Sequence, residues 1–353
     1  MEYKLNFDFG TTQRIIRKIG YIDSFKGRWS GLEISESKLL KELKQIATIA
    51  SIGSSTRIEG ATLSDEEVKE LLKSVSIGSL KDRDEQEVYG YYEVLELILD
   101  SYMEIDIKVN HIHHLHNLLL KASQKDEYHR GGFKQLSNKV VANYPGGKQK
   151  VIFNTTEPHL VVDEMEMIVA WTKTKLERDD IHPLIVIATF VYEFLSIHPY
   201  QDGNGRLSRL LTTLLLLRNG YDFMMYASME TEIEKQKKKY YNVLMECQRK
   251  RGLDEEVIGP WVEFFLKTLQ ESIEILESRY ADIKNKKSYL TERQQQIMQF
   301  MQEREPVKIS DIHNSFSDTT IYTIRKEVEY LKKENLIRQV GKGKATIYYI
   351  KDK

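Results

Sequence analysis

The chain has 353 residues and a formal net charge of −1, so it is long enough to bury a core in two or three domains. A charge so close to zero gives no global attraction to nucleic acid or to a membrane surface. The single cysteine, Cys247, cannot form an intramolecular disulfide, which is typical of a reducing compartment.

The longest apolar segment, residues 184–197, contains Glu193 and is shorter than the ~20 residues that a membrane-spanning helix needs. It therefore predicts a buried helix and no contact with a membrane. The first residues lack the basic and apolar stretches of a signal peptide, so we expect a cytoplasmic protein.

Scarce proline, with six residues in the chain, and 30% charged residues predict a mainly α-helical fold. Residues 1–36 are mixed, with aromatic anchors. Apolar residues at helical spacing then indicate a helix over 37–51 and a chain break near Gly60. Ser64 and Glu67 form a capping box that opens the next helix, and further helices are expected over 87–99 and 109–122.

The one clear β signal before the C-terminal region lies at residues 133–153. Two short β-rich runs there, 139–141 and 150–153, flank a Pro-Gly-Gly turn at 145–147 and predict a β-hairpin.

Helical patterns return after the hairpin and continue to a Lys- and Asn-rich stretch at 284–288, which is the best linker candidate. The expected helices are 158–175, 183–197, a helix ending at 217, 230–249 and 256–283. We divide the chain into an N-terminal helical region (1–100), a catalytic core (101–285) and a small C-terminal domain (286–353).

The C-terminal domain reads as three helices, opening near 291, 309 and 319, followed by strands over 336–340 and 345–350. This order resembles a winged helix, an α+β module that can place its third helix in the major groove of DNA. Glutamates dilute its basic charge, so we favour a protein contact for residues 290–353 and keep DNA as the second partner.

Residues 198–209 carry the strongest functional signal: His-Pro-Tyr-Gln-Asp-Gly-Asn-Gly-Arg-Leu-Ser-Arg. Glycines just before a helix allow backbone N–H groups to point inward, where together they can bind an anion. Here these residues are Gly203, Asn204 and Gly205. Arginines three residues apart lie on one side of the helix and can grip phosphate oxygens; these are Arg206 and Arg209. Asp202 is suited to bind Mg²⁺ beside a polyphosphate. His198 would be a base at the edge of this phosphate site.

This stretch resembles the signature of the Fic (Fic/DOC) family, His-Pro-Phe-x-(Asp/Glu)-Gly-Asn-Gly-Arg-x-x-Arg, with Tyr200 as the one departure. The resemblance implies a Fic-type helical bundle and transfer of AMP from ATP to a Ser, Thr or Tyr hydroxyl of a target protein. By analogy His198 is the catalytic base, Asp202 the Mg²⁺ ligand, and Gly203 to Arg209 the phosphate site.

A second motif, Ser55-Thr-Arg-Ile-Glu59-Gly60, resembles the family's inhibitory pattern, (Ser/Thr)-x-x-x-Glu-(Gly/Asn). The resemblance implies that Glu59 pairs with Arg209 and obstructs the seat of the ATP γ-phosphate. Alternatively, Glu59 is an ordinary surface residue at a helix end.

The hairpin at 133–153 corresponds in position to the flap with which relatives align a strand of the target protein by β-augmentation. A simple structural hairpin is the alternative. The sequence also leaves a homodimer open.

Four histidines lie within six residues, at 111, 113, 114 and 116. No third ligand is apparent for either helical pair, so we expect hydrogen-bonded helix histidines rather than a metal site. Tyr240 and Tyr241 could face an adenine, but core packing is the favoured interpretation.

Three other functions remain open. The first is removal of AMP, as in some relatives with an intact inhibitory glutamate. The second is transfer of a different phosphoryl group on the same scaffold. The third is a transcriptional regulator in which the core senses a ligand and the winged helix binds DNA.

Overall fold

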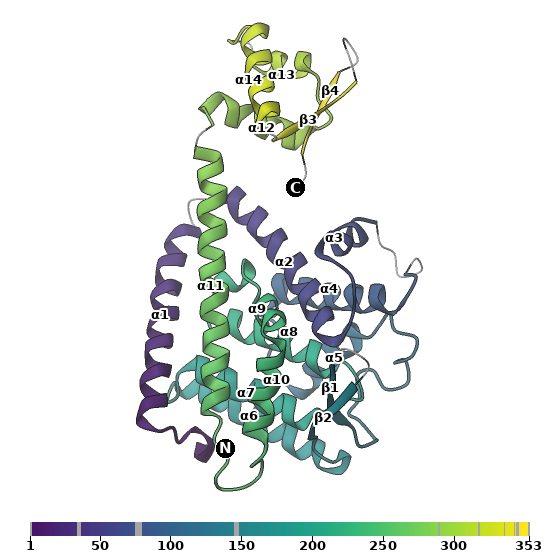
Figure 1. The fold of residues 1–353 in the computed structure, drawn as a ribbon, viewed down its shortest axis with the longest axis vertical. Coiled ribbons are helices and arrows are strands. Elements are labelled where there is room, and N and C mark those ends of the chain that lie inside the picture. The colour runs from purple at the N-terminus through teal and green to yellow at the C-terminus, as the bar shows by residue number, and fades with distance from the viewer. Residues whose placement is uncertain are drawn as a thin grey trace. The chain divides into compact units, whose positions relative to one another are not determined.

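The computed structural model describes residues 2–33, 37–74, 80–144, 148–288, 290–316, 318–334, 336–341, 343 and 346–351. The chain divides into two compact units, Met1–Ser278 and Arg279–Lys353 (Figure 1). Among the described residues, no helix combines the length and hydropathy needed to cross a bilayer.

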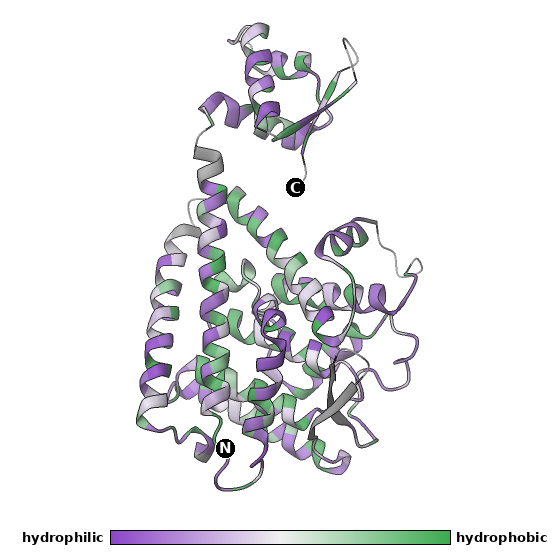
Figure 2. Cartoon of the chain, in the orientation of Figure 1, coloured by the Kyte–Doolittle hydropathy of each residue, from purple (hydrophilic) through white to green (hydrophobic). Residues whose placement is uncertain are grey.

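The N-terminal unit is a helical bundle with one β-hairpin. Figure 2 shows hydrophobic and hydrophilic residues interleaved along most of its helices, as expected for helices with one buried face. Its elements are η1 (Glu2–Leu5), α1 (Phe9–Glu33), α2 (Ser37–Glu59), α3 (Asp65–Ser74), α4 (Arg83–Ser101), α5 (Val109–Leu119), β1 (Lys139–Tyr144), β2 (Lys148–Asn154), η3 (Pro158–Leu160), α6 (Val161–Arg178), α7 (Pro183–Ile197), α8 (Asn204–Arg218), η4 (Asp222–Met225), α9 (Met229–Lys235), α10 (Lys237–Gln248) and α11 (Gly259–Ser288), the last running past Ser278.

Helices α7 and α8 form the centre of this unit, and the loop between them carries the 198–203 part of the motif. Every residue of α7 from Val186 to Ile197 is buried, as the apolar sequence predicts. Glu193, the one charge in that helix, is paired with Lys4 and with Arg251, whose Nη1 lies 2.7 Å from Glu193 Oε2. A buried carboxylate needs such partners because its desolvation is costly.

Local sequence signals fix several helix ends. Helix α2 ends at Glu59, and Gly60 follows with a φ of 112°, a backbone conformation that favours glycine. The predicted capping box is present: Ser64 N donates to Glu67 Oε2 at 2.9 Å, and Glu67 N donates to Ser64 Oγ at 3.3 Å.

Several expected bounds were wrong. Helix α2 continues to Glu59, past the predicted 51. Helix α4 begins earlier, at Arg83, because Asp82 caps it by accepting a hydrogen bond from Glu85 N. Helix α5 ends at Leu119, before the predicted 122. The expected helix over 230–249 is two helices, α9 and α10, which break at Gln236. The expected linker at 284–288 is helical, because α11 continues to Ser288.

The predicted hairpin is formed by the antiparallel strands β1 and β2, which pair from Lys139–Asn154 to Tyr144–Lys148 with a bulge between Val140 and Val141. The turn expected at 145–147 lies outside the described residues. Within the described part of the chain, this sheet contains only these two strands.

The C-terminal unit has a small core of its own. Its helices and strands are α12 (Glu292–Arg304), α13 (Ile309–Ser315), α14 (Ile321–Lys333), β3 (Ile337–Val340) and β4 (Ile347–Ile350), with β3 antiparallel to β4. The core joins residues from all three helices and both strands, including Ile297, Met301, Ile312, Ile324, Val328, Leu331, Ile337 and Tyr348.

Candidate active site

His198 terminates α7 in a left-handed backbone conformation, with φ 53° and ψ 61°. Its backbone N–H donates to Phe194 O at 2.9 Å, which closes the last turn of the helix. A non-glycine residue rarely adopts this conformation, and such residues concentrate at functional sites. Burial lowers the pKa of His198 to about 4, so its imidazole is neutral at physiological pH.

Lys134 is a buried cation that also lowers the pKa of His198. Its Nζ donates to Thr155 Oγ1 at 2.6 Å, to Asn138 Oδ1 at 2.8 Å and to Ile197 O at 3.1 Å. Burial in turn lowers the pKa of Lys134 to about 8. Lys134 therefore ties both ends of the hairpin to the C-terminus of α7.

The glycine loop leads directly into α8. Gly203, with a φ of 80°, is the N-cap residue, so the first N–H groups of α8 face the loop. Asn204 is buried and its side chain bridges the loop: Oδ1 accepts from Tyr200 N at 2.9 Å, and Nδ2 donates to Tyr200 O at 2.7 Å. The asparagine between the glycines thus fixes the loop backbone.

His116, from the histidine cluster on α5, packs against the same loop. Its ring stacks on that of Tyr200, with the centroids 3.7 Å apart. Nε2 lies 3.0 Å from Asp202 O, and Gly131 N donates to Nδ1 at 2.9 Å. His113 Nδ1 lies 2.9 Å from the Tyr200 hydroxyl, the group that the signature's phenylalanine lacks. These two cluster histidines therefore make hydrogen bonds, as expected.

Asp202, Arg206 and Glu87 form a second charged group, in which Arg206 and Glu87 are buried and Asp202 is half-buried. Arg206 is 2% exposed; its Nη2 lies 3.5 Å from Asp202 Oδ1, and its Nη1 lies 3.6 Å from Glu87 Oε2. Burial acts to raise the pKa of Asp202, but Arg206 and the Gly203 N–H outweigh it, so the pKa is lowered and the carboxylate is ionised. Glu87, on α4, also accepts from Arg83 Nε at 2.7 Å.

The predicted contact between the two motifs is present. Arg209 Nη2 lies 2.8 Å from Glu59 Oε1 and 2.9 Å from Ser55 O, and its Nε donates to Ser55 Oγ at 2.8 Å. Glu59 Oε1 also lies against the glycine loop, because a Cβ atom added at Gly205 would be only 2.1 Å from it. The Glu59 carboxylate therefore covers the start of α8.

The C-terminus of α2 is held firmly beside this contact. Arg57 makes a bidentate ion pair with Glu234 on α9, at 2.7 and 3.0 Å, and a second pair with Asp65 at 3.0 Å. Glu59 thus projects from a helix end that is anchored on two sides.

Several buried polar nitrogens of the site lack a hydrogen-bond partner among the described residues. They are His198 Nδ1, Arg206 Nε and Nη1, and Arg209 Nη1. Unpaired buried N–H groups are costly and are found where a ligand supplies the acceptor. Arg206 Nη1 has the Glu87 carboxylate at 3.6 Å, so Arg206 Nε and Arg209 Nη1 are the guanidinium nitrogens suited to the oxygens of a polyphosphate beside the glycine loop.

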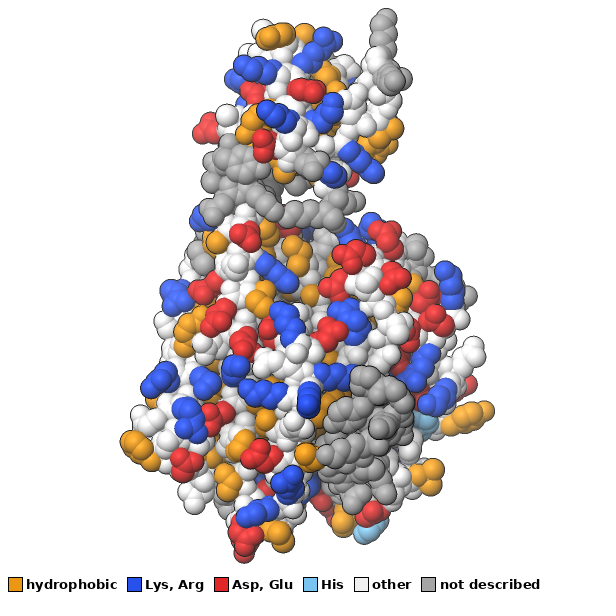
Figure 3. Space-filling view, viewed as in Figure 1, with side chains coloured by type: hydrophobic (Ala, Val, Ile, Leu, Met, Phe, Trp, Pro, Cys, Tyr) orange, Lys and Arg blue, Asp and Glu red, His pale blue; other side chains and the backbone are white. Residues whose placement is uncertain are grey.

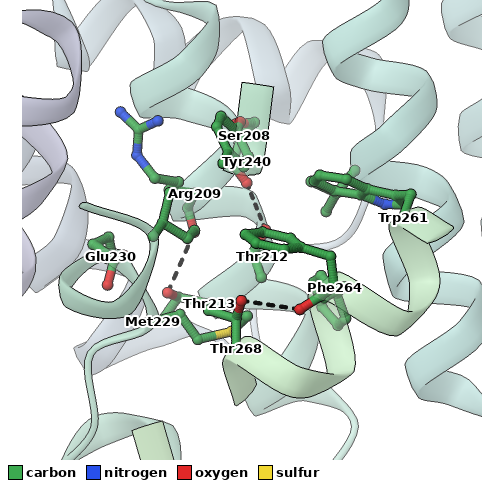
Figure 4. A pocket seen from close by; sticks show the side chains of 13 residues that line it. Ser208, Arg209, Thr212, Thr213, Met229, Glu230, Tyr240, Trp261, Phe264 and Thr268 are labelled. Atoms are coloured by element: carbon green, nitrogen blue, oxygen red, sulfur yellow. Dashed lines mark hydrogen bonds between the residues drawn. The ribbon is translucent and has the colours of Figure 1, made fainter. Parts of the chain in front are cut away.

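A pocket lies beside Arg209 between α8, α10 and α11 (Figure 4). The hydroxyls in its wall bond to their own helices: Thr212 donates to Ser208 O at 2.8 Å and Thr268 to Phe264 O at 2.9 Å. The pocket surface is therefore mainly apolar, and the Arg209 guanidinium points away from Trp261 in Figure 4. Tyr240 lines this pocket and is buried, as the core interpretation predicts, whereas Tyr241 is only half-buried.

Sequence reasoning missed Glu87, Lys134 and the loop contacts of His116. Lys134 lies directly after Arg130-Gly-Gly-Phe133, a stretch that resembles the start of the flap in Fic proteins. This position was the one sequence signal that could have pointed to Lys134. No pattern distinguishes Glu87 from the other acidic residues of α4.

In sequence and in fold the chain is similar to Fic proteins. Residues 106–216 match the family model described as "Fic/DOC family", so this stretch carries a Fic/DOC domain. The chain is 26% identical over 261 residues to the "Protein adenylyltransferase Fic" of Drosophila sechellia and of Drosophila melanogaster. The alignment covers 73% of this chain and 48% of each relative, so the chain spans about half the length of the curated relatives it matches.

Solved structures show the same fold. A Fic family protein from Desulfovibrio desulfuricans G20 is 21% identical, with a TM-score of 0.62 over 96% of both chains. Fic-1 from C. elegans is 20% identical, with a TM-score of 0.59 over 78% of this chain and 74% of that chain.

Proposed function

We propose that this protein is an adenylyltransferase that transfers AMP from ATP to a Ser, Thr or Tyr hydroxyl of a target protein. The observation that carries the proposal is that Arg206 Nε and Arg209 Nη1, beside the glycine loop, lack a hydrogen-bond partner among the described residues, with His198 at the end of the preceding helix. The adenylyltransferase relatives support ATP as the substrate.

In this mechanism the target hydroxyl gives its proton to the neutral imidazole of His198. The hydroxyl oxygen then forms a bond to the α-phosphorus, and the bond from that phosphorus to the oxygen bridging the α- and β-phosphates breaks. Pyrophosphate leaves with its charge offset by Arg206 and Arg209. Positioning and electrostatic stabilisation supply most of the rate.

Asp202 fits a magnesium ligand because its carboxylate is ionised, and among the described residues its Oδ2 accepts no hydrogen bond and pairs only with Lys125, at 4.0 Å. The described residues contain no group of three or more His, Cys, Asp or Glu side chains suited to a metal ion. Mg²⁺ is commonly held by one or two carboxylates, waters and substrate phosphates. When bound, Mg²⁺ would offset negative charge on the phosphates.

The β1–β2 hairpin is the proposed docking site for the target. Since no third strand joins this sheet among the described residues, its outer strand edges offer backbone groups for β-augmentation. Lys134, which bonds to Asn138 and Thr155 at the two ends of the hairpin, sets its position relative to His198.

Glu59 restrains the reaction in this proposal. A phosphate oxygen that approaches Arg209 and the first N–H groups of α8 must displace the Glu59 carboxylate, because that carboxylate lies against Gly205. The forms with and without Glu59 on Arg209 then differ in how ATP binds. The catalytic base, His198, is the same in both.

Labelled ATP tests the reaction class. Incubation with a cell lysate should transfer label from α-labelled ATP to protein and none from γ-labelled ATP, and mass spectrometry should find an added AMP. Transfer of the γ label alone would identify a kinase. Loss of AMP from a pre-labelled protein, without net addition by either the wild type or Glu59→Gly, would identify the reverse reaction.

The pH dependence of transfer should reflect the lowered pKa of His198. A base acts in its neutral form, so with a pKa of about 4 the rate should stay constant from pH 8 to about pH 5 and fall below it. Burial is the main cause and Lys134 the second, while Glu59 and Asp202 oppose them. Lys134→Met should therefore move the acid limb towards the ordinary value of 6.5.

Lys41→Met, which removes an exposed lysine from α2, is the matched control. Thermal unfolding should establish that both variants are folded. An acid limb near pH 6.5 in the wild type, or the same limb in Lys134→Met and the wild type, would contradict this account.

A further inference from the structure

Charge is unevenly divided between the two units. Residues 279–353 contain 16 Lys and Arg against 10 Asp and Glu, of which residues 290–351 hold 11 against 8, whereas the rest of the chain contains 36 against 43. A net charge near zero for the whole chain therefore conceals a basic C-terminal unit. Such an asymmetry between parts of a chain is typical of proteins with a nucleic-acid-binding module.

The acidic residues of this unit are largely engaged within it. Glu327 accepts a hydrogen bond from Gln294 Nε2 at 2.6 Å, and Glu329 lies 3.4 Å from Lys332 Nζ. Glu305 accepts from Ile350 N at 2.7 Å, and Asp311 accepts from Lys308 N at 2.8 Å at the start of α13. Glu329 therefore offsets the charge of Lys332, whereas Glu327, Glu305 and Asp311 accept hydrogen bonds from uncharged groups within the unit.

The basic residues of α14 behave differently. Arg325, Lys326 and Lys333 are exposed, and none forms an ion pair with another residue of the part of the chain that the structure describes. Figure 3 shows more Lys and Arg than Asp and Glu side chains on the visible face of this unit. The C-terminal unit therefore has a basic surface in the structure, although its sequence also contains glutamates.

One face of α14 combines this charge with an exposed aromatic ring. Ile324, Val328 and Leu331 face the core, so Tyr322, Lys326 and Lys333, spaced by four and seven residues, lie on the opposite face. Tyr322 is 76% exposed. A helix of 13 residues is ~20 Å long and an α-helix fits the major groove of duplex DNA.

We propose that residues 290–351 form a winged-helix module that binds duplex DNA, with α14 in the major groove and Arg325, Lys326 and Lys333 on phosphates. Helices α13 and α14 are separated by only five residues along the chain and share the core through Ile312 and Ile324, as in a helix-turn-helix. Tyr322 lies at the N-terminal end of α14, where such helices contact base edges. The proposal does not depend on the transferase activity.

Fluorescence anisotropy of the full-length protein with a labelled 30-base-pair duplex of random sequence tests the proposal. The wild type should bind, and log K should fall linearly with log salt concentration. Lys326→Glu/Lys333→Glu should weaken binding at least tenfold and reduce the salt slope by about 2, since each phosphate contact contributes about 0.9. Tyr322→Ala should weaken binding without changing the slope.

Arg17→Glu/Lys41→Glu is the matched control, because it makes the same change in charge at two exposed positions of α1 and α2. Circular dichroism and thermal unfolding should establish that all variants are folded. The proposal is overturned if the wild type shows no binding at 50 mM salt, as expected for a protein-docking module. It is equally overturned if the α14 double variant binds like the wild type, or if the control loses as much affinity as that variant.

Discussion

His198→Ala is expected to lower the rate of AMP transfer by about 10²–10⁴-fold, the usual contribution of a general base, while ATP binding changes little. His198 follows the last residue of α7, and its Nδ1 has no hydrogen-bond partner among the described residues, so its removal should leave the phosphate-binding nitrogens in place. Transfer should be measured with α-labelled ATP. Binding should be measured by calorimetry with Mg²⁺ in the Glu59→Gly background, where the site is open.

His159→Ala, at an exposed histidine of η3, is the control for loss of an imidazole elsewhere. It should transfer AMP at the wild-type rate. If His198→Ala labels its targets as fast as the wild type, His198 is not the base and the mechanism above is wrong.

Glu59→Gly is expected to raise auto-labelling with AMP by ~10–100-fold. A hydrogen bond to a charged group contributes about 1.5–3 kcal/mol, and each 1.4 kcal/mol corresponds to a factor of ten. Arg209 should keep its place in the variant because Ser55 Oγ and Ser55 O still accept from it at 2.8 and 2.9 Å. The change also costs α2 little, since Glu59 is its last residue.

Two further variants make this result specific. Glu59→Gln retains the shape of the side chain but removes its charge, so its rate should lie between the wild type and Glu59→Gly. Glu66→Gly changes an exposed glutamate of α3 and should leave the rate unchanged. An unchanged or lower rate in Glu59→Gly would rule out a restraining role for Glu59.

Much of the fold was predictable because its signals are local. Helix α7 has the predicted bounds, Pro183–Ile197, because proline opens it and its apolar run is uninterrupted apart from Glu193. The break at Gln236 was not predictable, since neither glycine nor proline marks it. At the break Gln236 Nε2 donates to Glu271 Oε2 on α11 at 2.6 Å, and at the start of α9 the buried Glu230 carboxylate accepts hydrogen bonds from Ser51 and Tyr91.

The site was predictable only in part. The loop and its two arginines are contiguous in sequence, but the contact between Glu59 and Arg209 joins residues 150 positions apart and was expected only from the family resemblance. Glu87, Lys134 and His116 act through contacts with distant residues and through burial. Neither the contacts nor the burial of these residues is encoded in a local sequence pattern. Their role in supporting the site was therefore found only in the structure.

The Glu59–Arg209 contact lies within one chain, and Arg57 anchors the helix that presents it. An intramolecular contact has a fixed effective concentration, so diluting the protein cannot weaken the restraint as it would weaken one supplied by a separate subunit. The activity per molecule of the proposed enzyme should therefore be independent of its abundance. It should instead respond to the supply of free nucleotide, which competes with Glu59 for the same guanidinium.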